Sequence, residues 1–150
     1  KHILYIIREM LDFHPVSHKT DIAAATAYLT RVMKRRCTSF IISDFYDDKD
    51  FEKEMEIANR KHDMVAIQVY DQRAKTLPDI GLLKVRDAET GHEMYIDTSS
   101  KKLRRAHTAY WLKREEQLKT TFAKSKVDWV SVATNEDFAK SLILLFKKRA

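Results

Sequence analysis

The stretch that decides the fold is residues 37–48, with the sequence Cys-Thr-Ser-Phe-Ile-Ile-Ser-Asp-Phe-Tyr-Asp-Asp. Its middle, Phe40-Ile41-Ile42, has the apolar and β-branched composition of a buried strand. Three carboxylates follow, at Asp44, Asp47 and Asp48. In parallel α/β sheets, ligands bind in the crevice beyond the carboxyl ends of the strands. Asp44 is therefore the first candidate for a functional residue.

Helical patterns flank this strand, and a second strand follows it. Apolar residues at three- and four-residue steps predict helices over residues 1–13, 20–36 and 50–61. Residues 64–70, Met-Val-Ala-Ile-Gln-Val-Tyr, predict a second buried strand that ends at Asp71. Strand, helix and strand with short connections indicate a right-handed parallel crossover. We expect Thr20 to cap the helix over 20–36, with Asp21 favourable at the positive end of the helix dipole.

The second half of the chain adds a hairpin, a long helix, a strand and a last helix. Short strands are predicted over 80–86 and 93–97, joined by Ala88-Glu89-Thr90-Gly91, where Gly91 takes a positive φ. A helix over 101–123 and a core strand over 127–132 follow. Thr134 is expected to cap the last helix. The inward side of that helix is predicted to be Phe138, Leu142, Leu145 and Phe146. The fold class is α/β: a mostly parallel sheet with helices on both faces and an inserted β-hairpin.

Composition limits the class of protein. The chain has 150 residues, of which 44% are hydrophobic and 33% charged, so we expect one folded domain over 1–150 and no extensive disorder. No apolar run reaches the roughly 20 residues that a membrane-spanning helix needs. The one cysteine, Cys37, cannot form an internal disulfide, which favours a reducing compartment, the cytoplasm. No base motif lies beside Cys37 in the sequence, so a nucleophilic role is not expected.

Several short motifs of this sequence resemble those of one known family. They are Lys19-Thr20-Asp21-Ile22, Ile42-Ser43-Asp44-Phe45, His62-Asp63-Met64-Val65, Val69-Tyr70-Asp71, Leu77-Pro78-Asp79-Ile80-Gly81, Asp87-Ala88-Glu89-Thr90-Gly91 and Asp97-Thr98-Ser99. With these motifs and this order of elements, nearly the whole chain resembles the second half of a von Willebrand factor A-like domain. It most resembles the bacterial family called domain of unknown function 58. The resemblance implies a Rossmann-like, von Willebrand A-type sheet.

The resemblance also implies a metal site. In such domains a divalent cation, usually magnesium, is held at the top of the sheet by three loops. Thr20 matches the second loop and Asp44 the third, and Ser43, Asp21 and Asp47 are expected to support them. The Asp-x-Ser-x-Ser of the first loop has no match, so we expect a partial domain without its first strands. Mg²⁺ or Mn²⁺ is therefore expected in the intact domain, with no tight binding by this chain alone.

The residues themselves leave simpler roles open. In the simpler interpretation, Thr20 is a helix N-cap without a ligand role. Asp44 is then a strand-end turn residue that accepts hydrogen bonds from nearby amides. The basic side chains at the start of the helix over 101–123 can form an ordinary solvated face, or they can form a nucleic-acid surface. These side chains are Lys101, Lys102, Arg104 and Arg105.

The resemblance implies a non-catalytic interaction module, in which a bound metal with an open position accepts an acidic side chain from a partner protein. The resemblance further implies that such proteins work beside MoxR-type AAA+ ATPases in the assembly or maturation of other proteins. One alternative is an enzyme that uses the acidic strand end for metal-assisted hydrolysis or phosphoryl transfer, with Asp71 as a further carboxylate. A second alternative is nucleic-acid binding through the basic helix. We also expect a homodimer through the exposed edge of the strand over 37–43.

Overall fold

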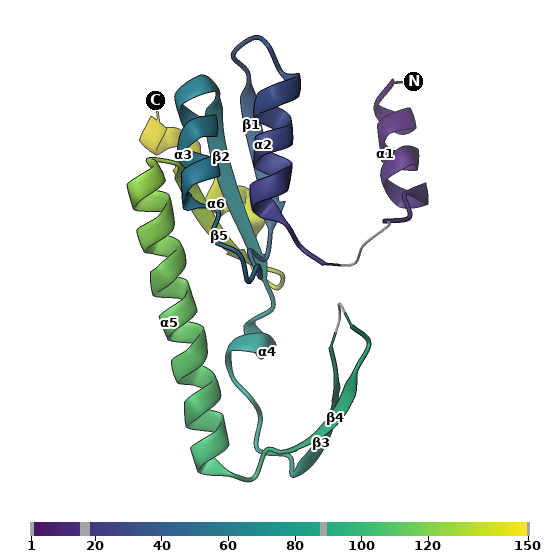
Figure 1. Cartoon of the computed structure of the whole chain (residues 1–150). Helices are drawn as coiled ribbons and strands as arrows, with labels where there is room; N and C mark the ends of the chain where they lie inside the picture. Colours follow the sequence, from purple (N-terminus) through teal and green to yellow (C-terminus); the bar gives the residue numbers. More distant parts are fainter. Residues whose placement is uncertain (1, 16–18, 88–89, 150) are drawn as a thin grey trace.

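A three-stranded parallel sheet forms the centre of the fold. The structure is a computed structural model that describes residues 2–15, 19–87 and 90–149. Its strands are β1 (Thr38–Ser43), β2 (Asp63–Tyr70) and β5 (Asp128–Ala133), in the order β1-β2-β5 (Figure 1). Both neighbouring pairs are parallel. The α/β class and the parallel crossover between the first two predicted strands are confirmed, with α3 (Glu52–Lys61) as the connecting helix.

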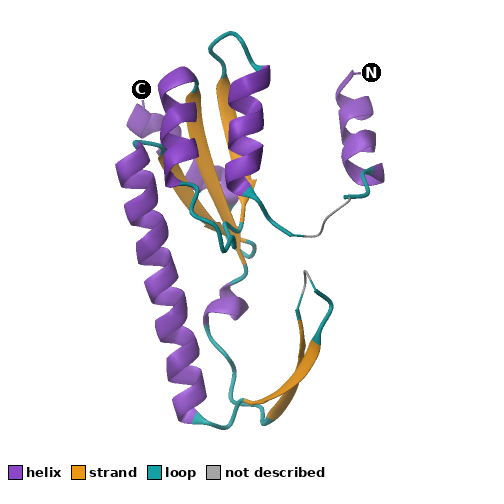
Figure 2. Ribbon diagram, in the orientation of Figure 1, coloured by secondary structure: helices purple, strands orange, loops and turns teal. Residues whose placement is uncertain are grey.

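Helices cover both faces of this sheet. In Figure 2, α2 (Ile22–Val32) and α3 lie in front of the strands and α6 (Phe138–Arg149) lies behind them. The long helix α5 (Lys101–Ser125) runs beside α3 and continues well past the sheet. Helix α1 (His2–Asp12) stands apart and buries none of its residues. Lys1, which the predicted first helix included, lies outside the described residues. Within those residues, no helix combines the length and the apolar character that crossing a membrane requires.

The predicted hairpin is present and lies near the N-terminal end of α5. It pairs β3 (Leu82–Arg86) with β4 (Glu93–Asp97) in antiparallel register (Figure 1). Gly91 has a φ of +69°, as the turn requires, whereas Ala88 and Glu89 of the predicted turn lie outside the described residues. A short helix that the sequence patterns did not predict, α4 (Gln72–Lys75), connects β2 to this hairpin segment. Asp71 caps α4 by accepting a hydrogen bond from the Arg73 amide.

The main core lies between the sheet, α3, the end of α5 and the loop that follows β1. Three phenylalanines form its centre: Phe45 lies 5.1 Å from Phe122 and 6.1 Å from Phe51, measured between ring centroids. Aromatic pairs at such distances contribute about 0.5–1.5 kcal/mol beyond the burial of their surface. Buried aliphatic residues surround them: Ile22, Met55, Ala58, Met64, Ala66, Leu118 and Val127. The β1–α3 loop is therefore fixed by the core rather than lying over it.

Two predicted helix caps are wrong. The N-cap of α2 is Asp21, not Thr20, because the Asp21 carboxylate accepts the hydrogen bond from the Ala24 amide at 2.8 Å. Thr134 does not cap α6, because its amide donates to the Tyr70 carbonyl and so extends the pairing of β2 with β5. The carboxylate of Asp137 accepts from the Ala139 amide at 3.0 Å instead. In both cases a carboxylate nearer the helix replaces the predicted hydroxyl.

The inward face predicted for α6 is partly wrong. Leu145 is buried, but Phe138 is 65% exposed and Phe146 is 45% exposed. Three strands offer too little surface to cover the whole apolar stripe of this helix. Phe146 instead contacts Phe40 of β1, edge to face, with ring centroids 6.2 Å apart.

Strand β1 lies at an edge of the sheet and pairs with β2 alone. Its apolar residues are therefore less buried than their composition predicts: Phe40 is 46% exposed and Ile42 is 66% exposed. The expectation that the strand over 37–43 has an open edge is confirmed for the described residues.

Candidate functional site

The candidate site lies where β1 ends. Asp44 follows the strand and is exposed, and its Oδ1 accepts a hydrogen bond from the Tyr46 amide at 2.9 Å. The Ser43 hydroxyl accepts from the Phe45 amide at 2.9 Å and lies 3.5 Å from the same Asp44 oxygen. Asp44 thus has the local turn role that was its simpler interpretation. These bonds all use Oδ1, so a role for the carboxylate toward a ligand stays open.

Phe45 gives this loop an unusual backbone. Its φ is +56°, in the left-handed region that residues with a side chain rarely adopt, and its side chain is 0% exposed. Such a conformation costs about 1–3 kcal/mol and persists only where the surrounding structure enforces it. Here the aromatic core enforces it, because the ring is held between Phe51 and Phe122. The burial of Phe45 turns the loop so that Asp44 stays on the surface.

A side chain from α5 also holds the loop. Arg114 donates hydrogen bonds to the carbonyls of Phe45 at 2.8 Å and Asp47 at 3.1 Å. Its guanidinium carbon lies 4.3 Å from the centre of the Tyr46 ring, a cation–π contact. The hydroxyls of Tyr46 and Tyr110 are 2.9 Å apart. This hydrogen bond, together with partial burial, raises the pKa of Tyr46 to about 12.

Asp47 joins the loop to the start of α2. It is 8% exposed, and its Oδ2 accepts a hydrogen bond from the Ile22 amide at 2.8 Å. Its Oδ1 accepts from the Lys49 amide at 2.9 Å. The Lys49 ammonium in turn forms an ion pair with Asp21. That ion pair, with the hydrogen bond from the Ala24 amide, holds the pKa of Asp21 below its ordinary value of 3.8.

The structure therefore brings together two segments that are about 25 residues apart in the chain. Thr20, Asp21 and Ser43 line one groove of about 390 Å³ between α2 and β1. Asp44 is the residue that follows Ser43 in the chain. The segments that contain the predicted metal-site residues thus lie side by side at one end of β1. This geometry leaves the expected metal-ligand role of Thr20 open, although Thr20 is not the N-cap.

The basic residues predicted as an interaction surface lie elsewhere, on the first two turns of α5 near the hairpin. Arg104 is used within the structure, because it pairs with Asp79 at 3.0 Å and donates to the Thr98 carbonyl. Lys101, Lys102 and Arg105 are exposed. The basic residues are therefore a separate surface and take no part in the Asp44 site.

Three residues of the site were missed from the sequence: Lys49, Tyr110 and Arg114. Tyr110 and Arg114 come from α5, 64 to 69 residues after the loop that they hold. Their spacing matches an ordinary helix, so no local pattern could identify them. Lys49 could have been considered, because it lies among the four carboxylates Asp44, Asp47, Asp48 and Asp50.

The oxygen atoms of this site are the kind of ligand that a hard cation prefers, but the site offers fewer of them than the cation needs. Magnesium prefers six oxygen ligands in an octahedron and accepts waters among them. Asp44 and Thr20 offer one carboxylate and one hydroxyl. Across the described residues, no three His, Cys, Asp or Glu side chains are grouped so that they could hold a metal ion. The donors of this chain therefore fit weak binding through a few protein ligands and several waters.

The fold and the site define an α/β domain with an acidic, strand-end loop. Residues 1–117 match the family described as "Protein of unknown function DUF58", and the chain belongs to that family. The uncharacterized protein MAV169 of Mycobacterium avium is 39% identical over 77 residues, which are 51% of this chain and 46% of that protein. The uncharacterized protein Rv1480 of Mycobacterium tuberculosis is 35% identical over 77 residues, 51% of this chain and 24% of that protein. The match thus spans less than half of each relative, and no solved structure matches the chain.

Proposed function

We propose that the β1–α3 loop and the start of α2 form the metal-binding face of a protein-interaction module of the von Willebrand A type. The observation that carries this proposal is the 2.8 Å hydrogen bond from the Ile22 amide to the Asp47 carboxylate. This bond draws the segment that contains Thr20 against the loop that contains Asp44. These are the two segments to which the resemblance assigns metal ligands.

In this proposal Asp44 and Thr20 hold Mg²⁺ or Mn²⁺. A cation held there would accept a carboxylate of a partner protein as a further ligand. Ser43 orients Asp44 through their contact at 3.5 Å. Asp21 and Asp47 do not bind the cation; they fix the start of α2 through its amides and through Lys49. The left-handed Phe45 supports the assignment, because enforced backbone strain is concentrated at ligand-binding loops.

The enzyme alternative depends on Asp71. That alternative needs a second free carboxylate at a neighbouring strand end, and Asp71 is the residue it relies on. The Asp71 carboxylate accepts the amide hydrogen of Arg73 at 2.9 Å and so acts as the cap of α4. This bond uses Oδ1 alone, as do those of Asp44, so it leaves a ligand role open at both residues. The membership of the family is what supports our choice of a binding module rather than an enzyme.

For the partner, we propose a protein with an exposed acidic side chain that acts with a MoxR-type AAA+ ATPase. Membership of the family is the support for this choice. The test is capture of a purified MoxR-type ATPase by the immobilised chain, with magnesium and with a chelator. Capture that needs magnesium and is lost in Asp44→Ala supports the proposal. Capture that is equal in the chelator, or unchanged in Asp44→Ala, contradicts it.

We also propose that the open edge of β1 pairs with a second copy of the chain. An edge strand offers unpaired amides and carbonyls. In β1 it also offers Phe40 and Ile42, which are 46% and 66% exposed, and the strand contains neither proline nor lysine to prevent pairing. This surface adjoins the groove beside α2, so self-association would take place next to the Asp44 site.

A further inference from the structure

Two reactive side chains, Cys37 and His62, lie together at the opposite end of β1 from Asp44. Cys37 directly precedes the strand, and its Sγ lies 3.4 Å from Nδ1 of His62. Cys37 is partly exposed, whereas the imidazole of His62 is 0% exposed. A nucleophile and a base within hydrogen-bond reach form the basic unit of nucleophilic chemistry. The sequence places no base motif beside Cys37, but the fold brings His62 to it from 25 residues further along the chain.

His62 is also incompletely bonded. Its Nε2 is buried and has no hydrogen-bond partner among the described residues. An unpaired polar atom in a dry site is destabilising, and native structures contain few of them without a functional reason. The polar contact of this ring is thus the one that its Nδ1 makes with the Cys37 sulfur. With its hydrogen on Nε2, the imidazole accepts the thiol hydrogen at Nδ1.

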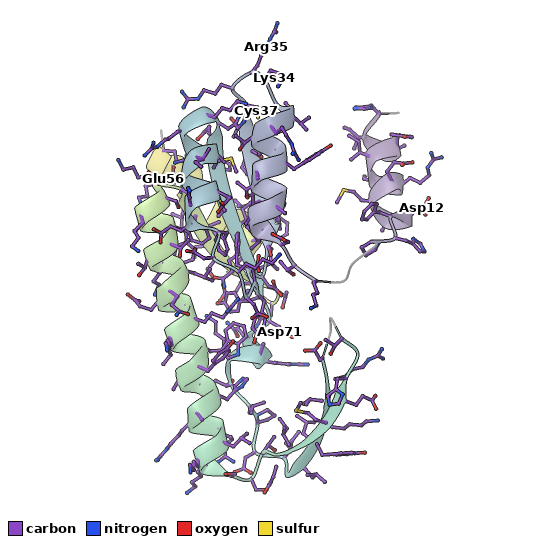
Figure 3. The ribbon with its side chains drawn as sticks, viewed as in Figure 1. Asp12, Lys34, Arg35, Cys37, Glu56 and Asp71 are labelled. Atoms are coloured by element: carbon purple, nitrogen blue, oxygen red, sulfur yellow. The ribbon has the colours of Figure 1, made fainter. Side chains whose placement is uncertain are left out.

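The loop before Cys37 is cationic. Lys34, Arg35 and Arg36 are exposed in the connection between α2 and β1. Figure 3 shows Lys34 and Arg35 at the same end of the molecule as Cys37, with Asp71 at the other end of the sheet. A local cluster of positive charge raises the concentration of small anions near it. We therefore expect the environment of Cys37 to favour anionic reagents.

We propose that Cys37 is a modification site that exchanges with small anionic disulfides, with His62 as its base. The Cys37 hydrogen moves to Nδ1 of His62 while the sulfur attacks one sulfur of the disulfide. The sulfur–sulfur bond of the reagent breaks, and a new one joins Cys37 to half of the reagent. The other half leaves as a thiolate and takes the proton from His62. The disulfide is the oxidant, so electrons and protons balance, and excess thiol reverses the step.

The experiment compares oxidised glutathione, an anionic disulfide, with cystamine, a cationic one. Intact-mass spectrometry follows modification of the folded chain, whose one cysteine makes the site unambiguous. We expect oxidised glutathione to react faster than cystamine. The triple variant Lys34→Gln, Arg35→Gln, Arg36→Gln changes exposed side chains and is expected to remove this preference. Equal rates with the two reagents in the unaltered chain overturn the proposed selectivity.

A synthetic peptide of residues 34–40 is the control for His62. It contains the same cations and the same cysteine but not the imidazole, and it needs no folding. The folded chain is expected to react roughly tenfold faster than the peptide at neutral pH, because a few per cent of a free thiol is already thiolate and a base can raise that fraction only by about that much. His62→Gln is expected to bring a folded variant down toward the rate of the peptide. A peptide that reacts as fast as the folded chain overturns the role of His62 whether or not that variant folds.

Discussion

Replacing Asp47 by alanine tests the hydrogen bond that connects the β1–α3 loop to the start of α2. The Asp47 carboxylate accepts hydrogen bonds from the Ile22 amide at 2.8 Å and from the Lys49 amide at 2.9 Å. Ile22 is 4% exposed, so water cannot replace the lost acceptor at its amide. Lys49 is exposed, and its amide can bond to water instead. The cost of the substitution therefore comes mainly from the Ile22 side.

The magnitude follows from these contacts. A hydrogen bond to a charged acceptor contributes about 1.5–3 kcal/mol. A carboxylate at the first turn of a helix adds about 0.3–1 kcal/mol through the helix dipole. Asp47→Ala should therefore lower the free energy of unfolding by about 2–4 kcal/mol. With a urea dependence of about 2 kcal/mol per M, the urea midpoint should fall by about 1–2 M.

Urea unfolding followed by circular dichroism measures this shift. Asp48→Ala is the matched control, because Asp48 is the neighbouring exposed carboxylate, and it should change the free energy by less than about 0.5 kcal/mol. Asp47→Asn keeps one acceptor oxygen and should fall between the two variants. An effect of Asp47→Ala as small as that of Asp48→Ala would show that Asp47 does not join the loop to α2.

Three further predictions concern individual contacts. Tyr110→Phe removes the hydroxyl that is 2.9 Å from the Tyr46 hydroxyl, so the pKa of Tyr46 should fall from about 12 toward 10.0. Tyrosinate absorbance measures this pKa, and an unchanged value would contradict the contact. Asp21 has a lowered pKa, so its stabilising contribution is complete above 3.8 and is lost as the pH falls through its lower folded value. Urea midpoints should thus decline more steeply with acid in the wild type than in Asp21→Asn, and parallel profiles would refute this. Ile42→Lys places a charge on the β1 edge and should abolish any self-association seen by light scattering at high concentration; a wild-type chain that is monomeric there would rule out pairing through this edge.

The fold could be predicted from the sequence where the pattern is local. The strand over 64–70, the hairpin with Gly91 and the long helix from Lys101 are each specified by their own residues, and the structure contains all three. The failures come from tertiary context. Phe138 and Phe146 belong to an apolar stripe that three strands do not cover, and Thr134 is used by the pairing of β2 with β5.

The candidate site could be predicted only in part, for the same reason. Thr20 and Asp44 were identified through motifs, and the structure brings their segments together. Arg114, Tyr110 and His62 were not identified, because each acts on a residue far away in the chain: Arg114 on Phe45, Tyr110 on Tyr46 and His62 on Cys37. Periodicity reports which face of an element is buried and does not report which partner it meets.

A magnesium titration of the chain, followed residue by residue with NMR amide resonances, tests the central claim most directly. We expect shifts at roughly millimolar magnesium, because two protein ligands and several waters bind weakly. The shifts should centre on Thr20, Asp21 and residues 43–47, and Asp44→Asn should remove them. Shifts spread over other acidic residues, or shifts at 43–47 that persist in Asp44→Asn, would contradict the assignment of a cation site to this end of β1.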